Sequence, residues 1–138
     1  MTAARSNSVR CLLGMLGTDV HSKGIRTIAR LLGDAGGIDV SYIGEHNTVE
    51  AMADAVVATN ADMVGVSFSS AAYVEYTRQL IAAMKERGVD HIPLMLGGLI
   101  HPGDLDELKG MGVAGLFGPG SKIEEIIAFV RSAGAERR

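Results

Sequence analysis

The stretch Leu16-Gly17-Thr18-Asp19-Val20-His21-Ser22-Lys23-Gly24 joins an apolar run to a helical pattern, and it decides the fold that the sequence predicts. Residues 9–16 before it are short and almost continuously apolar, as expected of a strand buried on both faces of a parallel sheet. After it, apolar side chains recur at helical spacing until Gly36-Gly37 ends the helix. The chain therefore opens with a strand, a glycine-bracketed loop and a helix, the unit of a doubly wound sheet.

The same alternation continues to the end of the chain. Further strands are expected over residues 38–43, 62–67, 91–96 and 113–117, and further helices over residues 49–59, 73–88, 105–111 and around 123–130. Five strands alternating with five helices predict an α/β fold, a flavodoxin-like (Rossmann-like), doubly wound five-stranded parallel sheet with helices on both faces. We expect one domain over residues 9–133, between a disordered tail of residues 1–8 and a frayed tail of residues 134–138.

The composition argues against nucleic-acid-binding, disulfide-bonded and membrane proteins. A formal net charge of -3 with 21% charged residues leaves no basic stripe, so nucleic acid is not an expected partner. The single cysteine, Cys11, stands inside an apolar run, which predicts a buried, inert thiol and a reducing, cytoplasmic setting. Residues 1–8 do not resemble a secretory signal and no stretch is long enough to span a bilayer, so no membrane is expected either.

Polar or glycine-rich loops follow four of the expected strands. In doubly wound sheets, ligands bind at the carboxyl ends of the strands, where the strand order reverses. The loops that meet there contain Asp19-His21, Ser67-Phe68-Ser69, Gly97-Gly98 and Gly118-Pro119-Gly120. An aspartate two residues before a histidine can hold one ring nitrogen while the other faces outward, which fixes the tautomer and makes the imidazole a better ligand or base.

Each loop also has a purely structural interpretation. The Asp-x-His pair could be a solvated turn, Gly97-Gly98 a simple strand exit, and Ser67 a cap before the next helix. His46, His91 and His101 are expected at the surface or in loops, because none has zinc-ligand spacing with another His or Cys. A phospho-receiver domain would need an aspartate where Ser67 stands, and a flavodoxin would need more aromatic residues than the 4% present.

Three of these motifs, taken together, resemble the signature of cobalamin-binding domains that hold the cofactor base-off with a histidine on cobalt. They are Asp19-x-His21-x-x-Gly24, Ser67 and Gly97-Gly98. The similarity covers residues 9–133. The sequence Phe-Gly-Pro-Gly-Ser at residues 117–121 is also similar to the fifth-strand exit of acyl-CoA mutases, the branch of methylmalonyl-CoA, isobutyryl-CoA and 2-hydroxyisobutyryl-CoA mutases.

This resemblance implies adenosylcobalamin as the cofactor, with His21 as the lower axial cobalt ligand and Asp19 as its hydrogen-bonded partner. It implies that Gly24 lets the nucleotide tail pass the first helix and that Ser67 bonds the dimethylbenzimidazole, for which Gly97 and Gly98 make room. The full implied cofactor-binding set comprises Thr18, Asp19, Val20, His21, Ser22, Gly24, Ser67, Ser69, Gly97, Gly98, Gly118, Pro119 and Gly120.

The function implied by the resemblance is that of a small subunit in a two-component acyl-CoA mutase, an isomerase that rearranges a carbon skeleton by radical chemistry. A separate large subunit would bind the acyl-CoA substrate in a hetero-oligomer, and no catalytic residue beyond the cobalt ligand is expected on this chain.

Two features depart from the family pattern. Met15 stands where acyl-CoA mutases usually have a lysine, which brings the chain closer to glutamate mutase, and Ser67-Phe68-Ser69 replaces serine-x-leucine. Three alternatives stay open at this point: the small subunit of a glutamate-mutase-like enzyme, a non-catalytic corrinoid carrier or sensor, and a flavodoxin-like domain with no cofactor.

Overall fold

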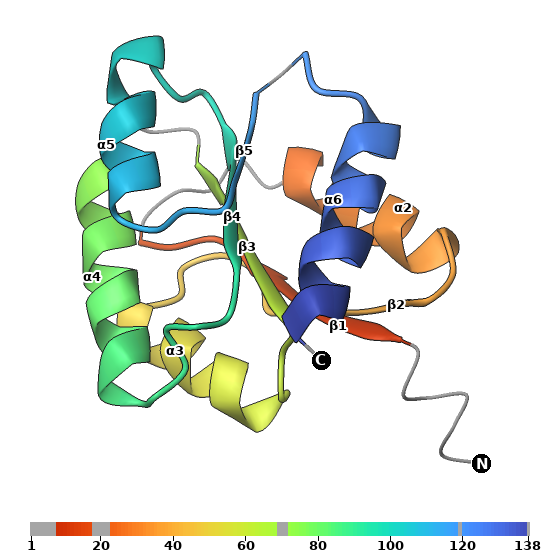
Figure 1. The fold of residues 1–138 in the computed structure, drawn as a ribbon, viewed down its shortest axis with the longest axis horizontal. Helices are drawn as coiled ribbons and strands as arrows, with labels where there is room; N and C mark the ends of the chain where they lie inside the picture. Colours follow the sequence, from red (N-terminus) through yellow and green to blue (C-terminus); the bar gives the residue numbers. More distant parts are fainter. Residues whose placement is uncertain (1–7, 18–22, 69–71, 119, 138) are drawn as a thin grey trace.

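The computed structural model describes residues 8–17, 23–68, 72–118 and 120–137, and it shows a twisted sheet between two layers of helices (Figure 1). The strands are β1 (Val9–Gly14), β2 (Ile38–Tyr42), β3 (Met63–Phe68), β4 (Leu94–Gly98) and β5 (Gly115–Phe117). The helices are α2 (Lys23–Asp34), α3 (Val49–Ala58), α4 (Tyr73–Glu86), the short 3-10 helix η1 (Pro102–Asp104), α5 (Leu105–Gly110) and α6 (Ile123–Arg137). In the part of the chain that is described, none of these helices combines the length and the apolar character that a membrane crossing requires.

The sheet has the strand order β2-β1-β3-β4-β5, and every neighbouring pair is parallel. The predicted flavodoxin-like fold is therefore confirmed. The chain first moves outward from β1 to β2 and then returns across β1 to β3, so the strand order reverses between β1 and β3. A crevice at the carboxyl ends of these two strands is the usual ligand site of this architecture.

The two faces of the sheet carry separate cores because successive side chains of a strand point to opposite faces. Leu12, Val64 and Leu96 belong to the core under α3 and α4. Leu13 and Met63 belong to the core under α2 and α6, on the other side of the sheet (Figure 1). Cys11 also lies in this second core, where burial raises the pKa of its thiol to about 12, as expected of an inert cysteine.

The strand β3 begins one residue later than the sequence predicts, at Met63, and two other strands begin two or three residues later. Residues before β4 form a turn in which the Ile92 N–H donates to the Val89 carbonyl oxygen, and Pro93 has no N–H for a sheet ladder. The strand therefore starts at Leu94, and it extends through Gly97 and Gly98, which pair with Ser67 and Phe68. In the same way β5 starts at Gly115 rather than residue 113, because Val113 donates its N–H to the Leu108 carbonyl at the end of α5.

The last helix is longer than predicted. We expected residues 134–138 to form a frayed tail, but α6 continues to Arg137. Gly134 is buried against Val9 of β1, so closely that a Cβ at residue 134 would collide with the valine side chain. The Arg131 guanidinium also donates to the Ala35 and Gly36 carbonyl oxygens at 2.8 and 2.9 Å. These contacts give the end of α6 tertiary support that helical periodicity in the sequence does not reveal.

Candidate cofactor-binding site

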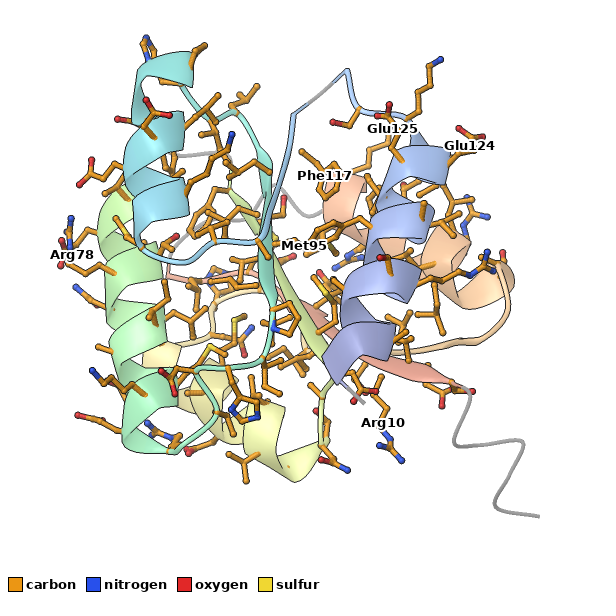
Figure 2. All side chains as sticks on the ribbon, viewed as in Figure 1. Arg10, Arg78, Met95, Phe117, Glu124 and Glu125 are labelled. Carbon is orange, nitrogen blue, oxygen red and sulfur yellow. The ribbon has the colours of Figure 1, made fainter. Side chains whose placement is uncertain are left out.

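A cavity of about 290 Å³ lies between the sheet and the helices α2 and α6, at the carboxyl ends of β3 and β4. Its walls are mostly apolar, with Ile25 and Ile28 from α2 and Ile126 from α6. The residues that the sheet contributes include Leu13, Gly65, Ser67, Met95, Gly97 and Phe117. Figure 2 shows Met95 and Phe117 between the sheet and α6, while Glu124 and Glu125 occupy the first turn of that helix.

The cavity exists because the strands present few side chains at this point. Along β3, Gly65 and Ser67 follow Met63 on the face that α2 and α6 cover, and along β4 Gly97 follows Met95. Ser67 and Gly97 are register partners across the sheet, so the two positions form one bare patch. On the opposite face the same strands carry Val66 and Leu96, which are fully packed.

The glycines of this patch have different structural roles. A Cβ at Gly65 would lie 2.6 Å from Leu13 Cδ2 and 2.8 Å from Met95 Cε, so this glycine makes room for neighbouring side chains. Among the described residues, a Cβ at Gly97 would meet the Phe117 carbonyl oxygen alone, at 3.6 Å, which is an ordinary contact distance. The side chain missing at Gly97 therefore leaves space that the protein itself does not use.

Gly98 is required by the backbone. Its φ is 114°, a conformation that residues with a Cβ rarely adopt, and a Cβ there would collide with the Phe68 carbonyl oxygen. That oxygen accepts a hydrogen bond from the Leu99 N–H at 3.2 Å, where the chain leaves β4. Gly98 lines the cavity as well, but its geometry explains the glycine without reference to a ligand.

The polar groups of the cavity are few. Ser67 is half-buried and lies in β3 rather than after it, and its hydroxyl can both donate to and accept from a ligand. Gly118 and Ser121 lie where β5 passes into α6, and the Gly118 N–H donates to the Ser121 hydroxyl oxygen at 3.1 Å. Gly24 lines the cavity from the first turn of α2, with no atom within 4 Å of the place where its Cβ would stand.

The structure thus brings together Gly24, Ser67, Gly97, Gly98 and Gly118 of the predicted set. Gly120 is exposed and does not belong to the cavity lining of the described residues. The remaining predicted residues lie outside the described part of the chain: Thr18, Asp19, Val20, His21, Ser22, Ser69 and Pro119. The other three histidines, His46, His91 and His101, are exposed, as predicted.

Sequence reasoning did not identify Gly65, Met95 or Phe117 as cavity residues. Gly65 could have been found, because it stands two residues before Ser67 and so lies on the same face of β3. Phe117 packs edge-on against Phe129 of α6, with ring centroids 5.5 Å apart and an interplanar angle of 69°. Phe117 is the member of this pair that lines the cavity, and Phe129 supports it from α6.

The cavity suits a flat, largely apolar group. Its volume is close to the lower end of small-molecule sites, about 300 Å³, and its mostly apolar walls with few polar groups are typical of such sites. The bare backbone at Gly97 allows a ring system to lie against the sheet. A heterocyclic base fits these features, which is the chemistry of the nucleotide tail of cobalamin.

Comparison with known proteins identifies relatives over the whole chain. The B12 binding domain family matches residues 9–128. The pivalyl-CoA mutase small subunit of Xanthobacter autotrophicus is 28% identical over 138 residues, 100% of this chain and 92% of the relative. The 2-hydroxyisobutanoyl-CoA mutase small subunit of Aquincola tertiaricarbonis is 30% identical over 129 residues, 94% of each chain. The methylmalonyl-CoA mutase of Rhizobium meliloti is 36% identical over 114 residues, which are 83% of this chain and 16% of that protein.

Solved structures share the fold. A cobalamin-binding protein from Desulfitobacterium hafniense superposes with a TM-score of 0.76 at 19% identity, over 93% of this chain and 60% of that one. The receiver domain of the Francisella response regulator 1452 superposes with a TM-score of 0.67 at 15% identity, over 95% and 100%. These likenesses concern architecture alone, whereas the family match extends from β1 into α6. The chain belongs to the B12-binding domain family, and small subunits of acyl-CoA mutases are its relatives along nearly its whole length.

Proposed function

We propose that this chain is the cobalamin-binding small subunit of a two-component, adenosylcobalamin-dependent acyl-CoA mutase of the cytoplasm. The observation that carries the proposal is the cavity at the ends of β3 and β4, where Ser67 and Gly97 leave one face of the sheet bare. The nearly complete coverage of two acyl-CoA mutase small subunits supports the same assignment. In this function a separate large subunit binds the acyl-CoA substrate, and the two chains form a hetero-oligomer.

The residues of this chain have the task of binding and orienting the cofactor. Ser67 would offer its hydroxyl to the dimethylbenzimidazole of the nucleotide tail, and the bare backbone at Gly97 would leave room for that base beside β4. The apolar walls from α2 and α6 keep water away from the tail. On the motif alone, His21 would be the residue that ligates the cobalt, and Asp19 would be the carboxylate that holds the other ring nitrogen of His21.

Adenosylcobalamin, when bound, would supply the radical chemistry that a carbon-skeleton rearrangement of the substrate requires. A neutral imidazole is the form of histidine that can ligate a metal, and a hydrogen bond from His21 to Asp19 would favour the tautomer that leaves the outer ring nitrogen free for the cobalt.

The proposal is tested by titrating the purified chain with cobalamin and following absorbance. The bound cofactor is then reduced to cobalt(II) and examined by electron paramagnetic resonance, beside His21→Ala and beside His91→Ala as a matched control at an exposed histidine. A base-off spectrum with one axial nitrogen, lost only in His21→Ala, is the expected result.

Two results would contradict parts of the proposal. An axial nitrogen signal that persists in His21→Ala would remove His21 as the ligand. Absence of binding, with and without candidate large subunits, would remove cobalamin altogether. Assaying the paired subunits with acyl-CoA thioesters and with glutamate then decides the substrate class.

A further inference from the structure

Tyr76, near the start of α4, covers Gly17 at the point where the loop after β1 begins. A Cβ built on Gly17 would lie 2.5 Å from Tyr76 Cζ and would collide with the phenol oxygen. Gly17 also has a φ of 68°, in the left-handed region that favours glycine. The phenol therefore occupies the place that a side chain at residue 17 would take. It does so from the face of the sheet opposite the cavity, because Tyr76 packs against the core under α3 and α4.

The Tyr76 ring is itself held in a cluster of three aromatic side chains. Phe68, the last residue of β3, is 1% exposed and stacks on Tyr76 with ring centroids 6.4 Å apart and an interplanar angle of 29°. Phe68 also contacts Tyr73, whose ring centroid is 6.2 Å away. The Tyr73 hydroxyl donates to Asp104 Oδ2 at 2.5 Å and accepts the His101 N–H at 2.9 Å. Phe68 of β3 is thus the ring that backs Tyr76 directly, whereas the Tyr73 hydroxyl joins α4 to the residues after β4.

Gly17 is held from a second direction by Asn47. The Gly17 N–H donates to the Asn47 carbonyl oxygen at 3.0 Å, and the Asn47 N–H donates to the Met15 carbonyl at 3.2 Å. The Asn47 side chain donates to the Met15 and Gly44 carbonyl oxygens at 3.0 and 2.8 Å. The backbone up to Gly17 is therefore fixed between the β2–α3 loop and the phenol of Tyr76.

We propose that Tyr76 is a positioning residue for the predicted cobalt ligand: its phenol fixes Gly17, which stands two residues before Asp19 and four residues before His21. The identity of the loop as a ligand loop rests on the proposed function, whereas the contact between Tyr76 and Gly17 does not. Removing a group that hydrogen-bonds directly to a metal ligand costs about 10- to 100-fold in metal affinity. Tyr76 acts one step further away, through Gly17, so we expect its removal to cost the lower end of that range, about 10-fold.

The test compares Tyr76→Ala, Tyr76→Phe and Tyr73→Phe with the unaltered chain. The last variant is a matched control, since it removes a tyrosine hydroxyl from the same helix without touching Gly17. Hydrogen exchange is measured on the cobalamin-free chain at residues 9–24, and cobalamin affinity and the axial nitrogen signal of cobalt(II) are measured on the loaded chain.

For Tyr76→Ala we expect faster exchange at residues 17–24 with exchange over β1 unchanged, about 10-fold weaker cobalamin binding, and a smaller axial nitrogen signal. Tyr76→Phe keeps the ring over Gly17 and should restore most of each property. Tyr73→Phe should leave both the exchange at residues 17–24 and the nitrogen signal unchanged.

Unchanged hydrogen exchange at residues 17–24 in Tyr76→Ala would overturn the proposal. Exchange that is faster by the same factor in every strand would also overturn it, because uniform acceleration means a general loss of stability. Should Tyr76→Ala fail to fold, Tyr76→Leu fills the apolar site and still leaves the place over Gly17 empty. If His21→Ala keeps the nitrogen signal, the proposed function fails at the ligand, while the exchange data still decide the role of Tyr76.

Discussion

Replacing Gly97 by alanine should separate the stability of the fold from the binding of the cofactor. The new Cβ would lie 3.6 Å from the Phe117 carbonyl oxygen and no closer to any other atom, so the cofactor-free chain accommodates it without strain. Glycine within a strand is less favourable than alanine by about 0.5–1 kcal/mol, because it loses more backbone entropy on folding. The free energy of unfolding of cofactor-free Gly97→Ala should therefore be unchanged or higher by about 0.5 kcal/mol.

The affinity for cobalamin, in contrast, should fall. The added methyl group stands in the cavity of about 290 Å³, at the register partner of Ser67. Extra carbon atoms in a filled, close-packed site cost about 1–3 kcal/mol, which corresponds to a loss of affinity of about 5- to 150-fold. Urea unfolding of the cofactor-free chain and a cobalamin titration of the same preparation measure the two effects.

Gly98→Ala is the control, because the two glycines are adjacent and the substitution is the same. A Cβ at residue 98 would collide with the Phe68 carbonyl oxygen at a φ of 114°, so this variant should lose more than about 1 kcal/mol of unfolding free energy. Cobalamin affinity at the unaltered level in Gly97→Ala would refute the assignment of the cavity to the nucleotide tail. A loss of stability in Gly97→Ala equal to that in Gly98→Ala would refute the geometric distinction between them.

Three further outcomes follow from single contacts. Asn47→Ala removes side-chain hydrogen bonds to the Met15 and Gly44 carbonyls and should lower the unfolding free energy by about 1–3 kcal/mol in urea unfolding. Cys11 should react with a thiol reagent only on unfolding. Because burial raises the pKa of its thiol to about 12, the stability it contributes is complete below the ordinary value of about 9 and is lost as pH rises from there toward 12. The hydrogen bond to Asp104 raises the pKa of Tyr73 above its ordinary value, so stability should fall as pH rises above about 10 and this dependence should weaken in Tyr73→Phe.

The order of strands and helices could be predicted from the sequence because each element carries its own periodicity. The buried runs around Leu12 and Val64 are too short for helices, and the glycines and polar residues between elements mark the turns. Element ends were less predictable where tertiary contacts decide them. The extension of α6 past Gly134 depends on Val9, which lies far away in the sequence. The late start of β4 depends instead on a local turn before Pro93, in which Ile92 bonds to Val89.

The candidate site was predictable in its residue types and not in its geometry. Ser67, Gly97 and Gly98 were found from a motif that treats both glycines alike, yet one leaves space for a ligand and the other satisfies the backbone. That distinction depends on the φ angle of each glycine and on the atoms nearest to the position of its missing Cβ. A sequence motif contains neither kind of information. The contact of Tyr76 with Gly17 was hidden for the same reason, since it joins α4 to the segment after β1, far away in the sequence.

One face of the sheet contributes mainly to the stability of the fold, and the other face provides the space for a ligand. On the face of α3 and α4, β3 and β4 present Val64, Val66, Leu94 and Leu96, all nearly fully buried, and this core is complete without a ligand. On the other face the same strands present Gly65, Ser67 and Gly97, and the helices α2 and α6 span a space that apolar side chains would normally fill. Such a space forfeits dispersion contacts and weakens that layer. Any group that fills it binds the folded chain alone and so stabilises it, by about 2.7 kcal/mol at one hundred times its dissociation constant. The complete face holds β1, β3 and α4 in place, and the aromatic cluster at the end of β3 reaches Gly17, two residues before Asp19 in the predicted ligand motif.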